Sequence, residues 1–423
     1  MLTVKLLHAA DLHIDSPMRG LVRYPGAPEE HLRGAARNAL RNLVGLALDE
    51  QVTAVLLAGD VYDGTWPDVN TGLFFTQQMQ LLREADIPVF MISGNHDAEN
   101  KMTVSLQLPD NVHRFDSAEA GTKVREDLGL AVHGQSFAQR DVTDNLAAGY
   151  PQARSNLFNV GLLHTALDGD RSSGHRPYAP CSLEQLVNRG YDYWALGHIH
   201  KREVKNADGV HVVFPGNIQG RHARETDAKG CTLVTVDAHL RVVGQPKHRD
   251  LDTSARWHRL EVDMGSASTM DEACALVEKE LADRVADQAI DGRVDAVRVV
   301  ATGASEAHSE LLGQQESFIG NVREISQQGR FSSVWIEKVG VRTSRPERWL
   351  PPEQVADAVE GIREEGGRLG GDTSRVRELL DRTRLRAKLP RELTEVFDQD
   401  GWAERTAEEA VEMLTVLLEE GKR

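Results

Sequence analysis

The chain has 423 residues, of which 40% are hydrophobic and 27% are charged. This length exceeds what one ordinary hydrophobic core needs, so we expect two or three domains. The net charge of −16 argues against a protein that coats nucleic acid through bulk electrostatics, although a local basic groove stays open. No apolar run reaches the roughly 18 residues of a transmembrane helix, so we expect no membrane partner. The three cysteines form no CxxC pair, which predicts a cytoplasmic protein without a disulfide framework.

Five short apolar runs occupy the first 200 residues, and each ends in polar side chains. They read VKLLHAADLH, TAVLLAGDVYD, PVFMISGNHD, LFNVGLLHT and YDYWALGHIH. Because these runs are apolar on both faces, we predict buried strands. Two amphipathic segments with helical spacing, residues 31–50 and 70–85, separate the first three runs. This order predicts an α/β sheet with helices on its faces, in which ligands gather at the carboxyl ends of the strands.

The pattern changes near Leu251. Residues 257–343 are predicted to form strand, helix, strand, helix and strand, which is a small separate α/β unit. The remainder is polar and helical, with a flexible break predicted over residues 364–374 and a last helix over about 406–420. Thr406 and Glu409 have the spacing of a capping box at the start of that helix. We therefore predict three parts, residues 1–250, 251–344 and 345–423.

The ends of the five predicted strands carry the side chains that could bind a metal ion or take part in catalysis. Each one singly has an ordinary explanation, since a histidine on a strand is often structural and an aspartate after a strand often caps a turn. Five consecutive strand ends of this kind are improbable as independent accidents. The residues are Asp11 and His13; Asp60 and Asp63; Asn95, His96 and Asp97; His164; and His198 and His200.

Imidazole and carboxylate together suit divalent cations such as Mn²⁺, Fe²⁺ or Zn²⁺. In the DxH and HxH motifs, residues i and i+2 share one face of an extended backbone, which would direct both side chains at one pair of ions. A carboxylate can bridge two ions roughly 3.5–4 Å apart, and the two ions can activate a hydroxide for in-line attack on phosphorus. The residues thus predict a two-metal phosphoesterase.

The motif order DLH…GDVYD…GNHD…H…GHIH resembles the calcineurin-like metallophosphoesterase superfamily over the whole predicted N-terminal domain. The resemblance implies a two-sheet α/β sandwich flanked by helices, with a small α/β capping domain and a helical C-terminal tail. It assigns one metal to Asp11, His13, Asp60 and His200, and the other to Asp60, Asn95, His164 and His198. It also makes His96 the catalytic acid or transition-state stabiliser and Asp63 the residue that orients His96. Turn capping stays an alternative for Asp63 and for Asp97.

Within that superfamily, DLHIDSP, LLAGDVYDG, GHIHK and FPGNIQGRH…KGC resemble the SbcD-type DNA repair exonuclease branch and its YhaO-like bacterial members. This implies a DNA nuclease with two divalent ions, expected to be Mn²⁺, that acts with an SMC-like coiled-coil ATPase, and it leaves a homodimer open. Many nucleases of this group outside bacteria carry His at the position of Asp63, so exonuclease against endonuclease character stays open. The alternatives are a small-substrate phosphodiesterase or phosphomonoesterase and a non-catalytic scaffold.

Basic residues beside the motifs are the expected DNA contacts, with a solvated surface cluster as the alternative. They are Lys201, Arg202, Arg221 and His222. The last predicted helix carries an apolar face made of Val411, Leu414, Leu417 and Leu418. That face is expected either to pack within the chain or to bind a helix of a partner.

Overall fold

A computed structural model describes residues 3–16, 26–63, 69–98, 107–168, 176–346, 352–372, 374–375, 378 and 401–420. The chain divides into two compact units, Met1–Ser344 and Arg345–Arg423. Within the described ranges, no helix is both long enough and apolar enough to cross a lipid bilayer.

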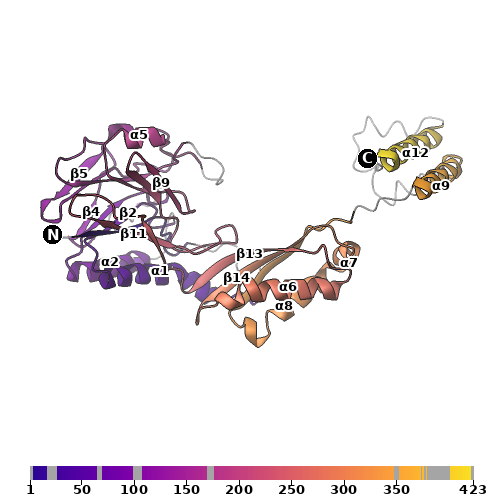
Figure 1. Ribbon diagram of the computed structural model, residues 1–423, viewed down its shortest axis with the longest axis horizontal. Coiled ribbons are helices and arrows are strands. Elements are labelled where there is room, and N and C mark those ends of the chain that lie inside the picture. The colour runs from indigo at the N-terminus through magenta and orange to yellow at the C-terminus, as the bar shows by residue number, and fades with distance from the viewer. Residues whose placement is uncertain are drawn as a thin grey trace. The chain divides into compact units, whose positions relative to one another are not determined.

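The first sheet has six strands in the order β12-β11-β1-β2-β3-β4. Neighbours among β1 to β4 are parallel, so the carboxyl ends of these strands meet at one edge of the sheet. Helices α1 (Glu29–Asp49) and α2 (Val69–Glu84) cover its outer face (Figure 1). The strand bounds are β1 Val4–Ala9, β2 Ala54–Ala58, β3 Val89–Ile92, β4 Val112–Arg114, β11 Gly230–Val236 and β12 Lys247–Asp250.

The second sheet has six strands in the order β5-β6-β7-β8-β10-β9, and the two sheets share one apolar core. Its outer face packs on the short helix α5 (Leu183–Val187). The strand bounds are β5 Gly121–Arg125, β6 Leu130–Gly134, β7 Phe158–His164, β8 Tyr193–Gly197, β9 Glu203–Ala207 and β10 Val210–Phe214. The five predicted strands are β1, β2, β3, β7 and β8, and the predicted two-sheet sandwich with flanking helices is confirmed.

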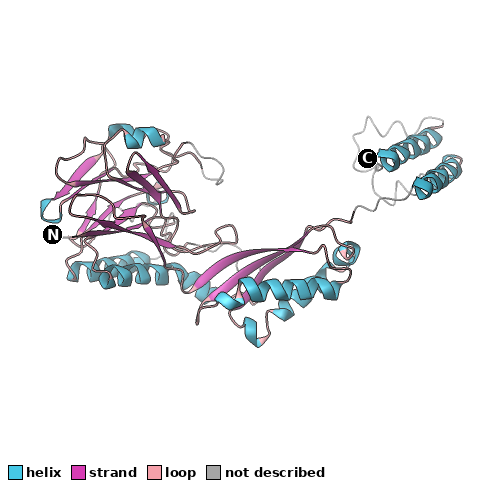
Figure 2. Ribbon diagram, viewed as in Figure 1, coloured by secondary structure: helices cyan, strands magenta, loops and turns pink. Residues whose placement is uncertain are grey.

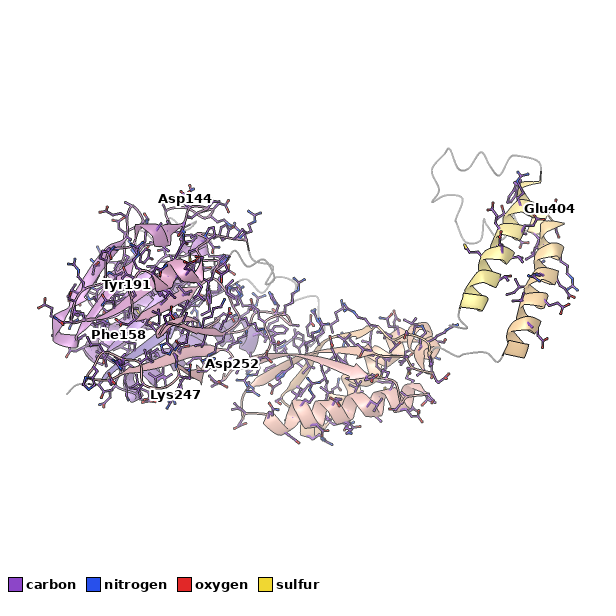
Figure 3. All side chains as sticks on the ribbon, turned by 45° about the horizontal axis from the view of Figure 1, so that its top comes forward. Asp144, Phe158, Tyr191, Lys247, Asp252 and Glu404 are labelled. Atoms are coloured by element: carbon purple, nitrogen blue, oxygen red, sulfur yellow. The ribbon has the colours of Figure 1, made fainter. Side chains whose placement is uncertain are left out.

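The third sheet, called the capping sheet below, follows the segment around Asp252, which Figure 3 labels. It has three parallel strands, β13 (Ala255–Asp263), β14 (Val294–Thr302) and β15 (Val334–Val341). Helices α6 (Met270–Arg284), α7 (His308–Gly313) and α8 (Gln315–Ile325) pack on one of its faces (Figure 1). The sequence predicted one helix where α7 and α8 stand. The helix breaks because Gly313 is a poor helix former and the Gln314 backbone leaves the helical region at φ −122° and ψ 40°.

The second unit contains two long helices, α9 (Pro352–Gly370) and α12 (Trp402–Glu420), which pack against each other (Figure 2). The flexible break predicted over residues 364–374 is wrong for its first seven residues, which lie in α9. Gly366 has a packing role there, because a Cβ atom on it would lie 2.1 Å from Cγ2 of Val411 in α12. Three of the four glycines in this polar segment therefore lie in a helix and do not mark a flexible break.

The predicted capping box at Thr406 is also wrong. Helix α12 begins four residues earlier at Trp402, and the Thr406 hydroxyl donates a hydrogen bond to the Trp402 carbonyl from inside the helix (2.8 Å). Of the predicted apolar face, Val411 lies toward Gly366 of α9, whereas Leu414 is 47% exposed. The side chains of Leu417 and Leu418 lie outside the described residues.

Candidate metal centre

The strand ends bring the candidate ligands together through an unusual backbone. Asp11, His13 and Asp60 have φ values of 51°, 43° and 52°, and His198 has a φ of 101°. The DxH and HxH segments are therefore not extended, and the expectation that each pair shares one face of a strand is wrong. A positive φ destabilises the fold by on the order of 1–3 kcal/mol for a non-glycine residue, and residues with such strained backbones cluster at functional sites. The left-handed turns, rather than the strand pleat, direct these side chains.

Three overlapping groups of donor atoms form at this edge, and the atoms of each group lie within 4.8 Å of one another. The groups are Asp11, His13 and His200; Asp11, Asp60 and His164; and His13, Asp60 and His96. The first contains the resemblance-based ligands of one ion except Asp60, which lies with His13 in the third group.

For the second ion, the structure places Asn95 Oδ1 3.0 Å from His164 Nε2, and His164 Nε2 3.5 Å from Asp60 Oδ2. His198 belongs to none of the three groups formed by the described residues. Its ring centroid lies 5.3 Å from that of His164, so it borders the cluster.

The hydrogen-bond partners of three rings set the tautomers that a cation needs. His200 Nδ1 lies 2.7 Å from Glu225 Oε1, and His164 Nδ1 lies 2.9 Å from the Ala58 carbonyl oxygen. His198 Nε2 lies 2.9 Å from the carbonyl oxygen of Arg176. A nitrogen that faces an acceptor carries the proton, so the other nitrogen keeps the lone pair that binds a metal. The donor set therefore fits divalent cations.

The charges of the cluster also favour the binding of cations. Burial raises the pKa of Asp11 to about 7, with the charge of His164 opposing this shift and that of Asp60 adding to it. Burial would also raise the pKa of Asp60, but the charge of His164 and its hydrogen bond hold that pKa well below the usual range. Burial lowers the pKa of His164, yet the charge of Asp60 raises it to about 9. Two buried carboxylates thus draw positive charge into this site, which bound cations would supply.

Asp63 and His96 form a contact at the side of the cluster. Asp63 Oδ1 lies 2.8 Å from His96 Nδ1, and Asp63 also accepts a hydrogen bond from the Ser16 hydroxyl. Burial lowers the pKa of His96, but the bond to Asp63 and the charges of Asp60 and Asp63 outweigh it and place the pKa above its ordinary value. This is the contact that an orienting role for Asp63 requires.

Asp97 has a structural role. Its carboxylate accepts hydrogen bonds from the backbone N–H groups of Val61 (3.2 Å), Tyr62 (2.9 Å) and Gly94 (3.0 Å). These bonds hold the loop that follows Asp60. The turn-capping alternative for Asp97 is thereby confirmed.

A pocket of about 300 Å³ lies over the cluster. It is lined by Asp60, Asn95, His96, Arg140, Arg176, Tyr178, His198, His200 and Arg221. Sequence reasoning missed Arg140, Arg176 and Tyr178, because they adjoin none of the strand-end motifs. Of the expected DNA contacts, only Arg221 lines this pocket, while Lys201, Arg202 and His222 are exposed and do not line it.

Arg221, which is half-buried, pairs with the buried Glu225 beside His200. Arg221 Nη2 lies 3.0 Å from Glu225 Oε1, and Arg221 Nη1 lies 3.5 Å from Asp63 Oδ2. Glu225 also accepts hydrogen bonds from the Arg221 backbone N–H (2.8 Å) and from Asn217 Nδ2 (3.0 Å). Sequence reasoning missed Glu225, since no motif or fixed spacing links it to the histidine it holds. The guanidinium of Arg221 is thus engaged with carboxylates next to the cluster.

Two family models match the chain. Residues 4–202 match calcineurin-like phosphoesterase, and residues 257–344, which contain the capping sheet, match the middle domain of metallophosphoesterase YhaO. The chain is 38% identical over 283 residues to "Uncharacterized metallophosphoesterase YhaO" of Bacillus subtilis (strain 168), an alignment covering 66% of this chain and 68% of that one.

Two more distant relatives carry the name DNA double-strand break repair protein Mre11. The protein of Sulfurisphaera tokodaii is 23% identical over 248 residues, which cover 55% of this chain and 60% of its own. The protein of Sulfolobus acidocaldarius is 24% identical over 263 residues, with 56% and 62% covered. The chain therefore aligns with less than two thirds of the length of either Mre11 protein.

Proposed function

Because the chain belongs to the YhaO family of calcineurin-like metallophosphoesterases, we propose that it is a DNA nuclease that uses two divalent ions, assigned as Mn²⁺. The observation that carries the phosphoesterase chemistry is the donor cluster in which hydrogen bonds hold His200 and His164 in the ligand tautomer. When bound, the ions activate water and neutralise charge on the phosphate. The proposed ligands are Asp11, His13, Asp60 and His200 for one ion, and Asp60, Asn95, His164 and His198 for the other.

The chain's own residues then position the substrate and move its proton. His96 lines the pocket beside the proposed ligands, and its contact with Asp63 favours the protonated ring. We assign it the role of donating a proton to the leaving oxygen. Arg140 and Arg176 line the same pocket and supply positive charge for anionic groups of the substrate.

The phosphoesterase assignment is tested with a small chromogenic diester, bis-p-nitrophenyl phosphate. The purified full chain should hydrolyse it with Mn²⁺ and should be inactive with EDTA. Asp60→Asn should remove most of the activity, because this carboxylate belongs to two of the three donor groups. Robust hydrolysis without any divalent metal would contradict the mechanism.

The identity of the substrate as DNA is a more specific proposal than the phosphoesterase chemistry. It is supported by the similarity to proteins named DNA double-strand break repair protein Mre11 and by the arginines that line the pocket. Linear duplex DNA should be degraded from its ends. The double variant Arg140→Ala and Arg176→Ala should lose more activity on DNA than on the small diester. Its DNA binding should also show a flatter salt dependence, since the slope is about −0.9 per phosphate neutralised on duplex DNA.

The double variant Lys201→Ala and Arg202→Ala tests the contacts that the sequence predicts outside the pocket. Arg221→Ala is unsuitable for this purpose, because Arg221 contacts Glu225 and Asp63 beside the proposed ligands. If both double variants cleave DNA as the parent chain does, the DNA assignment fails. The pocket of about 300 Å³ would then favour a small-substrate phosphodiesterase.

We also propose a partner surface on α12 for a coiled-coil ATPase. Met413 and Leu414 are 66% and 47% exposed, which is high for large apolar side chains on a helix. Replacing both by serine should abolish coelution with such an ATPase and leave diester hydrolysis intact. The proposal also includes a homodimer and a cytoplasmic location. The location is supported by the three cysteines, which are free thiols, as expected in a reducing compartment.

A further inference from the structure

The loop between β10 and β11, residues 215–229, holds the carboxylate that orients His200. Glu225 in this loop is 7% exposed, and its Oε1 lies 2.7 Å from His200 Nδ1. Its Oε2 accepts hydrogen bonds from Asn217 Nδ2 and from the backbone of Arg221. Because both carboxylate oxygens are bonded, the position of Glu225 follows the conformation of this loop.

The same loop is bonded to the first residues of the capping sheet. Trp257 Nε1 in β13 donates a hydrogen bond to the Gly220 carbonyl (2.9 Å), and Gln219 Nε2 donates one to the Ala255 carbonyl (2.7 Å). The Trp257 side chain is 4% exposed and belongs to an apolar cluster with Ala223 of the loop. The start of β13 is therefore fastened to the loop by two hydrogen bonds and by packing.

Gly220 is closely packed between the Trp257 ring and the backbone of Glu225. A Cβ atom on Gly220 would lie 2.6 Å from the Glu225 carbonyl oxygen and 3.0 Å from Cδ1 of Trp257. The Gly220 backbone is thus pressed between the tryptophan ring and the backbone of the glutamate. A shift of the ring is transmitted to Glu225 because close-packed groups have no void to absorb it.

We propose that Trp257 and Gln219 are positioning residues that couple the capping sheet to the metal centre through Gly220 and Glu225. A displacement of the capping sheet then changes the orientation of His200, and hence metal affinity, in addition to access of substrate. This inference rests on the proposed metal ligands, but it does not depend on DNA being the substrate.

The segment that enters the capping sheet has a second attachment, which supplies a matched control. Asn42 of α1 donates hydrogen bonds through Nδ2 to the Leu251 carbonyl (2.9 Å) and to Thr253 Oγ1 (2.7 Å). Among the described residues, Asn42 makes no hydrogen bond to the loop or to a proposed ligand. Asn42→Ala therefore loosens the entry to the capping sheet but removes no hydrogen bond of the loop, whose last residue, Lys229, accepts one from the Leu251 backbone N–H (2.8 Å).

The test measures Mn²⁺ binding to the full chain by calorimetry, together with thermal stability in the metal-free state. Trp257→Phe keeps an aromatic ring and removes the Nε1 donor. It should raise the Mn²⁺ Kd of one site by about 3- to 10-fold, less than the 10- to 100-fold expected when a direct partner of a ligand is lost, as in Glu225→Gln. Gln219→Met, of similar size, should act in the same direction. Asn42→Ala should leave the Kd unchanged.

The kinetic readout is hydrolysis of bis-p-nitrophenyl phosphate at subsaturating and saturating Mn²⁺. The activity lost in Trp257→Phe should be recovered at saturating Mn²⁺. Unchanged Mn²⁺ affinity in both Trp257→Phe and Gln219→Met would overturn the coupling. An equal loss of affinity in Asn42→Ala would also overturn it, because general loosening would then explain the effect. If the parent chain binds no Mn²⁺, the proposed function itself fails.

Discussion

The imidazole of His96 has the geometry of two roles, metal ligand and acid. It belongs to a donor group with His13 and Asp60, but its Nδ1 lies 2.8 Å from Asp63. The contact with Asp63 leaves Nε2 available for either role, as the contact with Glu225 does for His200. We assign the proton-donor role because His96 lines the pocket and its side chain is 28% exposed, whereas the proposed ligand histidines are buried.

His96→Ala should therefore retain two bound Mn²⁺ ions and lose turnover by about 10²–10⁴-fold, the usual size of general acid catalysis. Metal content and single-turnover rates on the small diester measure the two effects separately. Asp63→Asn should give a smaller loss, since it keeps a side chain beside the ring and removes only its charge. A parallel fall of metal content and activity in His96→Ala would make His96 a ligand.

The sequence was informative for residues that directly follow apolar strands. Asp11 and Asp60 could be placed together because the carboxyl ends of the parallel strands β1 and β2 meet at one sheet edge, whereas His164 ends β7 of the other sheet. Glu225 and Arg140 could not be foreseen, because their nearness to the cluster depends on how distant loops return to it. The positive φ values of Asp11 and His198 also had no signal, since neighbouring contacts impose them.

At the scale of elements, the contact between α9 and α12 depends on a glycine that the sequence alone misrepresents. The apolar runs of the first 200 residues are short but unbroken, and helical spacing marks the segments between the first three, so those strands and helices could be predicted. In α9, by contrast, glycines normally weaken a helix, and only the position of α12 shows why one is needed.

Two glycine variants of α9 should therefore have opposite effects. Gly366→Ala places a methyl group against the stiff Val411 side chain and should destabilise the helix pair, as overpacking typically costs about 1–3 kcal/mol. Gly361→Ala meets no atom within 4 Å and should stabilise α9 by about 0.5–1 kcal/mol. Hydrogen exchange of the α9 amides measures both. Stabilisation by both variants would show that the contact with α12 is not formed.

At the scale of the whole chain, the capping sheet belongs to the compact unit that carries the metal cluster, whereas α9 and α12 form the other unit. The change of pattern near Leu251 precedes the start of the capping sheet at Ala255, but it does not divide the compact unit Met1–Ser344. The burial of Trp257 against Ala223 and Leu32 could not be predicted, because it joins parts of the chain that are far apart in sequence.

A chain ending at Ser344 should bind Mn²⁺ and hydrolyse the small diester as the full chain does. A chain ending at Asp250 should bind Mn²⁺ more weakly and aggregate, because Leu32, Ala35 and Ala223 lose their cover and Gly220 loses its hydrogen-bond donor. Calorimetry and light scattering compare the two. Equal Mn²⁺ affinity in both shortened chains would contradict this expectation.

The proposed ligands come from both sheets of the sandwich: Asp11, Asp60 and Asn95 follow strands of the first, and His164 and His198 end or follow strands of the second. Divalent ions bound by these residues would therefore link the two sheets, which otherwise contact each other through their apolar core. A ligand that binds only the folded state, at a concentration of 100 times its Kd, raises the free energy of unfolding by about 2.7 kcal/mol. Mn²⁺ should raise the melting temperature and slow amide exchange in β7 and β8 as well as in β1 and β2. The cell's supply of metal would then set how long the folded protein survives, as well as how fast it works.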